Sequence, residues 1–263
     1  MAKQKVELET TRRSAPQILE QVKNNGREEL ARSSKALAFS GVAGGLTMGL
    51  TGLSVAITQS ILRPNGSSEF VSHLMYPMGF IAVIIGRAQL FTENTLYPVI
   101  LVLDEHRHVR NMLRLWAIVF ISNVAGAFLF ALLAVRTSSL MPEYAEALIK
   151  LGADALAQST PHIFWSGVIG GWIIALVAWM VSASHWTIGQ IAIVWMATFL
   201  VGLGHFAHCI ATSGEILAAV CAGRASVGAY AHWIVFATLG NIVGGVMIVS
   251  LLNYGQVKAG EPE

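Results

Sequence analysis

Six apolar runs constrain this chain most strongly, because each is long enough to cross a lipid bilayer. A transmembrane helix needs about 20 predominantly apolar residues, and charged residues make up only 12% of the sequence, against about 25% in soluble domains. The sequence therefore predicts an all-α integral membrane protein with six transmembrane helices in residues 35–253. The six runs are residues 35–57, 70–103, 110–136, 161–183, 187–217 and 227–253.

The fifth run changes from apolar to polar halfway along. After an apolar stretch that ends at Gly204, it contains His205, His208, Thr212 and Glu215. Ionisable groups at membrane depth are costly, so they normally line a cavity or a permeation path. A transmembrane helix that turns polar beside a glycine is typical of a discontinuous helix, whose broken backbone is tolerated where it lines a pore. We interpret this stretch as one half of a site at the membrane centre.

The two halves of the chain repeat one another. Residues 40–45 (SGVAGG) recur as 166–171 (SGVIGG) at an offset of 126, and residues 122–127 (SNVAGA) recur as 240–245 (GNIVGG) at an offset of 118. Residues 35–136 and 161–253 are therefore predicted to be two copies of a three-helix unit. Because each copy crosses the membrane an odd number of times, the copies insert in opposite senses, as in inverted-repeat channels and transporters.

The offset of 118 also maps Gly86 onto Gly204 and Leu90 onto His208. The second run has its own polar interruption at residues 86–95 (GRAQLFTENT). Corresponding interruptions in two halves indicate a binding site near the midplane, so helices 2 and 5 are both expected to be broken. The alternative is a pair of kinked helices packed through small residues.

Several polar residues near these breaks are candidates for bracing them or for selecting a solute. Asn123 and Asn241 hold equivalent places in the two copies, and an amide in hydrocarbon must find hydrogen bonds. We expect them to bind backbone groups freed by the breaks. Arg87, paired with Glu93 or with Glu215, is expected either to hold a break or to form a charged lining. Asn94, in the first interruption, is a further candidate for bracing a break or selecting a solute.

Basic residues are more numerous on one side of the six predicted spans, the side that would hold the N-terminal cluster, Lys35, Arg107, Arg110, Arg114 and Lys258. Ser14 and Pro16 predict the start of a helix, and its apolar stripe is typical of an amphipathic helix beside a membrane. An excess of Lys and Arg marks the cytoplasmic side. We therefore expect a cytoplasmic amphipathic segment at residues 1–34 and a short cytoplasmic tail at residues 254–263 of a bacterial inner (plasma) membrane protein.

Four segments resemble the formate/nitrite transporter family: residues 90–92 (LFT), 167–180 (GVIGGWIIALVAWM), 208–211 (HCIA) and 240–245 (GNIVGG). With the glycine-rich first run, the resemblance covers about residues 40–253. It implies a homopentamer of aquaporin-like six-helix protomers, each with its own pore and with breaks in helices 2 and 5. It also implies transport of small monovalent anions such as formate, nitrite and hydrosulfide, often coupled to protons.

The chain departs from the formate-channel pattern near the pore. Ala207 precedes the central His208 where the best-studied members have an acidic residue, and Thr212 stands where an Asn is common. Together with Arg87, Glu93 and Glu215, these residues resemble the less characterised YfdC-like branch of the family. The transported solute therefore stays open: a neutral or cationic solute is the alternative to a weak-acid anion.

The expected pathway is built around His208, which exchanges protons near neutral pH. A weak acid protonated by His208, directly or through water, would cross the constriction as a neutral molecule. Thr92 is expected to hydrogen-bond the solute opposite His208, and Thr212 to lie along the pathway. The constriction is assigned to Leu90, Phe91 and Phe206.

Other functions find less support in the sequence. His205, His208 and Cys209 are too few for a zinc site, no cofactor motif is present, and no nucleophile–base pair indicates an enzyme. Apart from the short basic N-terminus, no basic patch indicates nucleic-acid binding. A scaffold without a pore is disfavoured by the paired interruptions. The expected partners are therefore a small anion, protons, the lipid bilayer and further copies of the chain, with no cofactor or metal.

Overall fold

The computed structural model describes residues 12–62 and 66–260, and the regular structure in these residues is all helical. This confirms the all-α membrane fold. Five helical stretches of the described chain are long and apolar enough to cross a membrane, and the predicted fifth span is instead two shorter apolar helices. The five stretches are Ser34–Ile61 (α2), Ser68–Ile85 (α3 and α4), Val109–Arg136 (α6), Thr160–Ala183 (α8) and Val227–Lys258 (α11 and α12).

The second and fifth spans are both interrupted. In the second, α4 (Met78–Ile85) and α5 (Tyr97–Glu105) are separated by eleven residues that include a single 3-10 turn, Glu93–Thr95. In the fifth, α9 (Thr187–Leu203) and α10 (Ala211–Cys221) are separated by residues 204–210. The breaks expected in helices 2 and 5 are therefore present, and both fall where the sequence turns polar.

The two breaks begin with the same hydrogen bonds. In the first, the amides of Gly86, Arg87 and Ala88 donate to carbonyls of residues 82, 84 and 83, and in the second the residues 118 positions later make the same three bonds. Arg87 (φ 59°) and His205 (φ 49°) are left-handed, as a helix-ending Schellman turn requires. That position usually holds glycine, because left-handed backbone strains residues with a Cβ. An arginine and a histidine there indicate a role for their side chains.

Glycines bring the long helices into close contact within each half. α2 packs against α6, and α8 against α11 (Val227–Val243). A Cβ on Gly45 would lie 1.9 Å from the carbonyl oxygen of Asn123, and one on Gly171 would lie 2.2 Å from that of Asn241. Only glycine permits such an approach of two backbones, and small residues commonly serve this purpose in membranes. The two halves thus share one glycine-mediated helix crossing, while the opposite insertion of the two halves stays a prediction.

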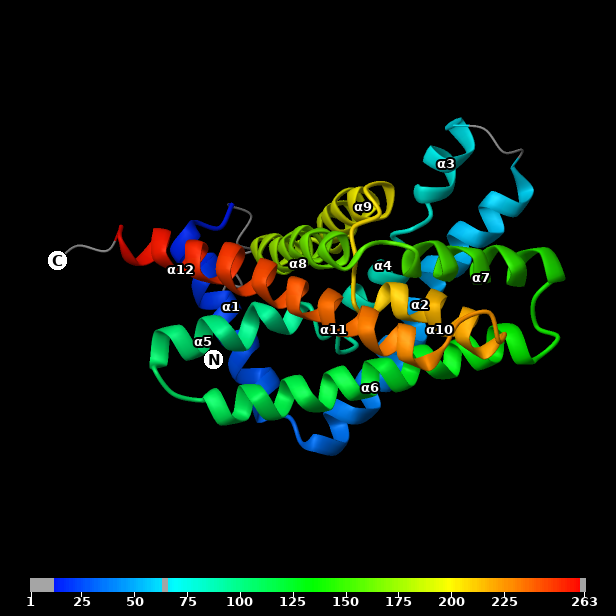
Figure 1. The fold of residues 1–263 in the computed structure, drawn as a ribbon. Coiled ribbons are helices and arrows are strands. Elements are labelled where there is room, and N and C mark those ends of the chain that lie inside the picture. Colours follow the sequence, from blue (N-terminus) through cyan, green and yellow to red (C-terminus); the bar gives the residue numbers. More distant parts are fainter. Residues whose placement is uncertain (1–11, 63–65, 261–263) are drawn as a thin grey trace, which may run out of the picture.

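Shorter helices cover the two ends of the bundle (Figure 1). α1 (Ala15–Ala31) begins where Ser14 and Pro16 predicted it, and it packs against α5, α8 and α12 (Leu251–Lys258) at one end. At the other end lie α3 (Gly66–His73) and α7 (Pro142–Leu156). The last helix runs to Lys258, so the predicted tail at residues 254–263 begins inside a helix.

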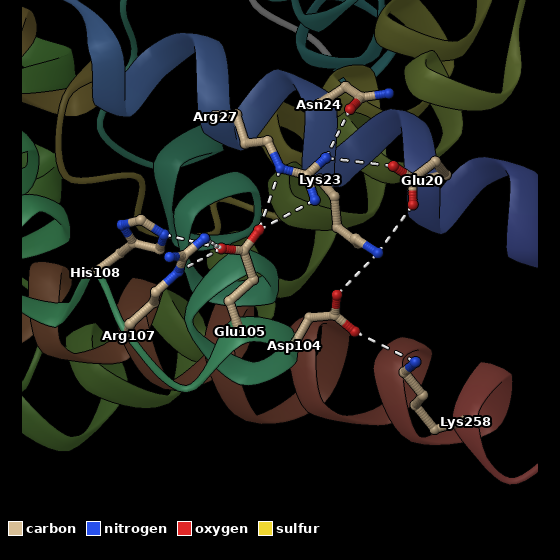
Figure 2. Close-up of polar contacts among 9 residues, drawn as sticks. All are labelled: Glu20, Lys23, Asn24, Arg27, Asp104, Glu105, Arg107, His108 and Lys258. Carbon is tan, nitrogen blue, oxygen red and sulfur yellow. Dashed lines mark hydrogen bonds and ion pairs between the residues drawn. The ribbon is translucent and has the colours of Figure 1, made fainter.

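Ion pairs join α1 to the bundle, as Figure 2 shows. Lys23 on α1 and Lys258 on α12 both reach Asp104 at the end of α5, with N–O distances of 2.8 and 3.3 Å. Arg27 on α1 reaches Glu105 at 3.1 Å. The amphipathic segment predicted in residues 1–34 therefore contains a helix fixed to the bundle by charges and by its buried apolar stripe, rather than one free in the interface.

The sixth span contains an irregularity that its repeat partner lacks. Between α11 and α12, residues Gly244–Ser250 form a π-helix, which holds one residue more per turn than an α-helix. The hydroxyl of Ser250 donates to the carbonyl oxygens of Thr95 at 2.9 Å and Gly245 at 3.1 Å. The π-helix thereby contacts the first break directly.

Candidate solute pathway

The two breaks meet at a buried imidazole–hydroxyl pair. Thr92, from the first break, places Oγ1 2.8 Å from Nε2 of His208, which lies in the second break. Both residues are 0% exposed. The backbone N–H of Ala211, at the start of α10, donates to Nδ1 of His208 at 3.0 Å. Because Nδ1 accepts, the neutral ring carries its hydrogen on Nε2 and donates it to Thr92. The hydroxyl hydrogen of Thr92 is then available for another acceptor.

This geometry differs from the expectation in one respect. Thr92 and His208 were expected to lie opposite one another with a solute between them, whereas the structure joins them directly. Phe80 on α4 covers the imidazole edge to face, with ring centroids 5.0 Å apart. His208 therefore lies in a dry environment of aromatic and aliphatic groups.

The two asparagines make the same hydrogen bonds in the two halves. Asn123 donates through Nδ2 to the carbonyls of Gly41 and Gln89, at 2.8 and 2.9 Å, and accepts the N–H of Phe91 at 2.9 Å. Asn241 donates to the carbonyls of Gly167 and Ala207, both at 2.8 Å, and accepts the N–H of Cys209 at 2.9 Å. Each amide thus binds two backbone groups inside a break and ties that break to a neighbouring helix, which is the pattern expected of a brace.

A cavity of about 330 Å³ opens on the side of α7; we call it the α7-side cavity. Phe206, Thr212 and Glu215 are among its lining residues, so these three predicted site residues share one space. The remaining titratable groups in the lining are Glu69, His73, Tyr76, Asp154, His162 and His205.

A smaller cavity of about 40 Å³ opens on the side of α1; we call it the α1-side cavity. Its lining contains the predicted residues Arg87, Leu90, Glu93 and Asn94. α1 and α7 lie at opposite ends of the bundle (Figure 1), and neither cavity is lined by Thr92 or His208. The imidazole–hydroxyl pair therefore lies between two cavities and separates them.

The charged residues at the breaks are divided between the cavities. Arg87 is exposed and interacts electrostatically with the buried Glu93 across the α1-side cavity, at a distance longer than an ion-pair contact. Glu215 lines the α7-side cavity. Of the two pairings considered from the sequence, the structure therefore brings Arg87 toward Glu93 and keeps it apart from Glu215.

Asn94 and Gln89 hold the first break to α1. Asn94 donates to Oε1 of Gln89 at 2.9 Å, and Gln89 donates to Oε2 of Glu29 on α1 at 2.6 Å. Sequence reasoning missed Gln89, whose side chain links the break to a helix 60 residues earlier. Phe91 lines neither cavity; its ring packs against Trp116 and Phe120 on α6.

A histidine cluster at the mouth of the α7-side cavity was also missed. Glu69 on α3 lies 3.0 Å from Nε2 of His205, and the ring of His73 lies edge to face against that of His205, with centroids 5.1 Å apart. No sequence signal pointed to it, because Glu69 lies between the first two predicted spans and His205 lies 136 residues further on. Within the described residues, no three His, Cys, Asp or Glu side chains are placed to hold a metal ion.

Two broken transmembrane helices that meet at a buried polar pair, with a cavity on either side, define a protein of the channel or transporter class. Comparisons with known proteins identify the family within this class. Residues 16–255 match the family model described as formate/nitrite transporter. The chain therefore belongs to the formate/nitrite transporter family, as its motifs indicated.

A relative and two solved structures agree with this assignment. The chain is 33% identical over 244 residues to the inner membrane protein YfdC of Escherichia coli (strain K12), a match that covers 92% of this chain and 78% of YfdC. It superposes on an FNT family ion channel with a TM-score of 0.82 at 19% identity, covering 94% of this chain and 100% of that one. A pentameric formate channel with formate bound gives a TM-score of 0.70 at 17% identity, covering 90% and 99%. These structures share the fold.

Proposed function

We propose that this protein is a channel or transporter for small monovalent anions of weak acids, such as formate, and that each anion crosses the constriction together with a proton. The observation that carries this proposal is the buried Thr92–His208 pair, placed between two cavities and reached from neither. Membership of the formate/nitrite transporter family and the shared fold of a formate-bound channel support it.

The chemistry of the pair suits a small oxyanion. The neutral imidazole donates to Thr92, which leaves the threonine hydroxyl hydrogen free to bind an anion oxygen. The N-terminal end of α10 adds partial positive charge beside His208. These groups attract an anion without a fixed cation that would trap it. Moving a bare anion through the dry constriction is costly, so the solute crosses as its neutral acid.

His208 assists this passage in two ways. In its neutral form it positions the hydroxyl of Thr92. It can also relay a proton from Nε2 through Thr92 if a proton first binds Nδ1, which requires the hydrogen bond from the Ala211 N–H to break. Leu90 and Phe206 border the constriction from the two cavities.

The relatives support a proposal for the assembly and the location. We propose a homopentamer, as in the formate channel that shares the fold, in a bacterial inner membrane, as the name of YfdC implies. Exposed apolar side chains such as Phe39, Ile121 and Met196 would then face lipid or neighbouring protomers. The basic residues around α1 support a cytoplasmic location for both ends of the chain. In this role the protein is a transporter and not an enzyme.

A second candidate solute class is favoured by the acidic lining of both cavities. Glu69, Asp154 and Glu215 line one cavity, and Glu28, Glu29 and Glu93 line the other. Carboxylates repel anions and attract cations, so a neutral or cationic solute is the alternative cargo.

Measuring the uptake of several solutes by purified protein in proteoliposomes distinguishes weak-acid anions from the neutral or cationic alternative. Formate, nitrite and hydrosulfide represent weak-acid anions, urea represents a neutral solute, and methylammonium represents a cation. The proposal expects uptake of at least one anion, faster at lower external pH and accompanied by acidification of the vesicle interior. Transport of urea or methylammonium without uptake of any anion would establish the alternative.

A further inference from the structure

Glu215 is a buried carboxyl group without a polar partner. It is 8% exposed, it lines the α7-side cavity, and it makes no side-chain hydrogen bond or ion pair within the described chain. Six other buried polar side chains on and beside the breaks are hydrogen-bonded: Thr92, Asn94, Asn123, His208, Ser213 and Asn241. An unpaired buried carboxylate is costly, so this group has a use that its packing does not explain.

A glycine on α2 makes room for this carboxyl group. A Cβ on Gly52 would lie 2.5 Å from Cγ and 2.8 Å from Oε1 of Glu215. On the other side, α7 approaches so closely that a Cβ on Gly152 would lie 2.2 Å from the carbonyl oxygen of Glu215. The side chain of Glu215 is therefore packed against α2, and the residue also lines the cavity.

Glu215 also lies near the constriction. Thr212 follows His208 by one helical turn, with its N–H donating to the His208 carbonyl at 3.1 Å, and Glu215 follows Thr212 by three residues on the same face of α10. Thr212, Phe206 and Glu215 line the same space. A solute that reaches the constriction from the α7 side therefore passes Glu215.

The α1-side cavity contains a counterpart. Glu93 is 9% exposed, follows Thr92 directly in the first break, and makes no side-chain hydrogen bond within the described residues. Its charged neighbours are Arg87 and Glu29, both in the same cavity. One nearly buried carboxyl group thus stands on each side of the Thr92–His208 pair.

The imidazole itself is poorly placed to supply a proton. Nδ1 accepts from a backbone N–H and Nε2 donates to Thr92, so neutral His208 would have to become an imidazolate to give its proton away. A carboxylic acid gives up a proton to a weak-acid anion far more readily, because the two groups are chemically alike.

We propose that Glu215 and Glu93 are the proton-exchange groups of this transporter, one for each cavity; this inference rests on the proposed function. Glu215, as the acid, gives its proton to an oxygen of the entering anion: the O–H bond at Glu215 breaks and one forms on the solute. The neutral acid passes Thr92 and returns the proton to the Glu93 carboxylate on the other side. Exchange with water in each cavity restores both groups, and reversal of the steps gives transport in the other direction.

The test compares E215Q and E93Q with the unchanged protein in proteoliposomes that contain a pH-sensitive dye, with a formate gradient as the driving force. Glutamine keeps the size of the side chain and removes the exchangeable proton. E215D keeps the carboxyl group, and E143Q removes an exposed carboxylate on the same face but outside the cavity. The pH profile of uptake is recorded for each variant because other groups titrate in these cavities: Glu69, His73, Tyr76, Asp154, His162 and His205 on one side, and Glu28, Glu29, Arg87 and Tyr97 on the other.

We expect proton-coupled formate uptake to fall at least tenfold in E215Q and in E93Q, to be partly kept in E215D with a displaced pH profile, and to be unchanged in E143Q. Uptake by E215Q within twofold of the unchanged protein would overturn the inference. So would equal loss in folded E215Q and E215D, which would indicate a structural role. If E215Q fails to fold, a pH profile of E215D identical to that of the unchanged protein overturns it, and a displaced one supports it. Unchanged protein that carries no weak acid at all overturns the proposed function, and the inference with it.

Discussion

Thr92 and His208 lie 116 residues apart in the sequence, in opposite halves of the chain, and share a 2.8 Å hydrogen bond at the centre of the bundle. Each belongs to a different broken helix, so the bond forms only when both breaks are in place. The constriction is thus a joint product of the two halves, and a change in either residue alters it.

Loss of either partner of this bond is expected to abolish coupled transport. His208→Ala removes the donor to Thr92, and Thr92→Val removes the hydroxyl hydrogen that binds the anion while keeping the side-chain shape. We expect proton-coupled formate uptake to fall at least tenfold in both variants, measured in proteoliposomes. Unchanged uptake by His208→Ala would remove the imidazole from the mechanism. Thermal unfolding of each variant in detergent controls for loss of fold.

Replacement of either bracing asparagine is expected to destabilise the protein. Asn123→Leu and Asn241→Leu each remove three hydrogen bonds and leave buried backbone groups without partners. Each such group costs about 1–3 kcal/mol, so a loss of about 3 kcal/mol or more is expected, visible as a lower Tm. Asn111→Leu, at an exposed position, serves as the matched control. A Tm equal to that of the unchanged protein in both asparagine variants contradicts the bracing role.

Alanine at either helix crossing is expected to prevent folding. In Gly45→Ala and Gly171→Ala the new methyl group would overlap a backbone carbonyl on the neighbouring helix, so α2 and α6, or α8 and α11, must separate. Gly255→Ala meets nothing within 4 Å and is expected to be neutral or to stabilise α12 by up to about 1 kcal/mol, since alanine favours helix over glycine. Size-exclusion chromatography after expression separates the outcomes. A folded, fully active Gly45→Ala protein would show that the crossing tolerates a wider spacing.

Acid is expected to loosen α1 from the bundle. Hydrogen bonds from Arg107, then from His108 and Arg27, lower the pKa of Glu105 from 4.5 to about 2. A carboxyl group with a lowered pKa stabilises the folded state above its unfolded pKa, and this contribution is lost as the pH falls toward the folded value. The contribution of Glu105 is therefore lost between about pH 4.5 and 2.

Hydrogen exchange of the α1 amides across this pH range measures the effect. Glu105→Gln is expected to make α1 exchange faster at neutral pH and to weaken the further increase on acidification. If α1 exchange in Glu105→Gln matches that of the unchanged protein at neutral pH, the ion pair between Arg27 and Glu105 in Figure 2 contributes nothing to its attachment.

The broken helices could be predicted from the sequence because they leave a local signal. Gly86 and Gly204 stand at the same offset in the two repeats, and each precedes a run that is too polar for hydrocarbon. Asn123 and Asn241 were found in the same way. A buried amide must have partners, and the breaks free backbone groups that can serve as such partners. These features depend on residue type and spacing, which the sequence states directly.

Contacts between distant segments could not be predicted in this way. The bond of Gln89 to Glu29 spans 60 residues, and that of His205 to Glu69 spans 136. Glutamine, glutamate and exposed histidine carry no periodic signal, since each also occurs on ordinary solvated surfaces. The direct bond between Thr92 and His208 was missed for a related reason. Motif spacing indicates which residues face the centre, and it does not show whether two of them touch.

The π-helix in the sixth span changes the direction in which the side chains after it face, relative to the matching helix of the first half. A wider turn absorbs about one extra residue, and each residue advances a helix by about 100° around its axis. Beyond Ser250, side chains of α12 therefore face a different direction from those at matching positions at the end of α6. Val257 and Lys258 consequently meet α1 and Asp104, so a one-residue deletion in this span would turn the end of the chain away from its anchor.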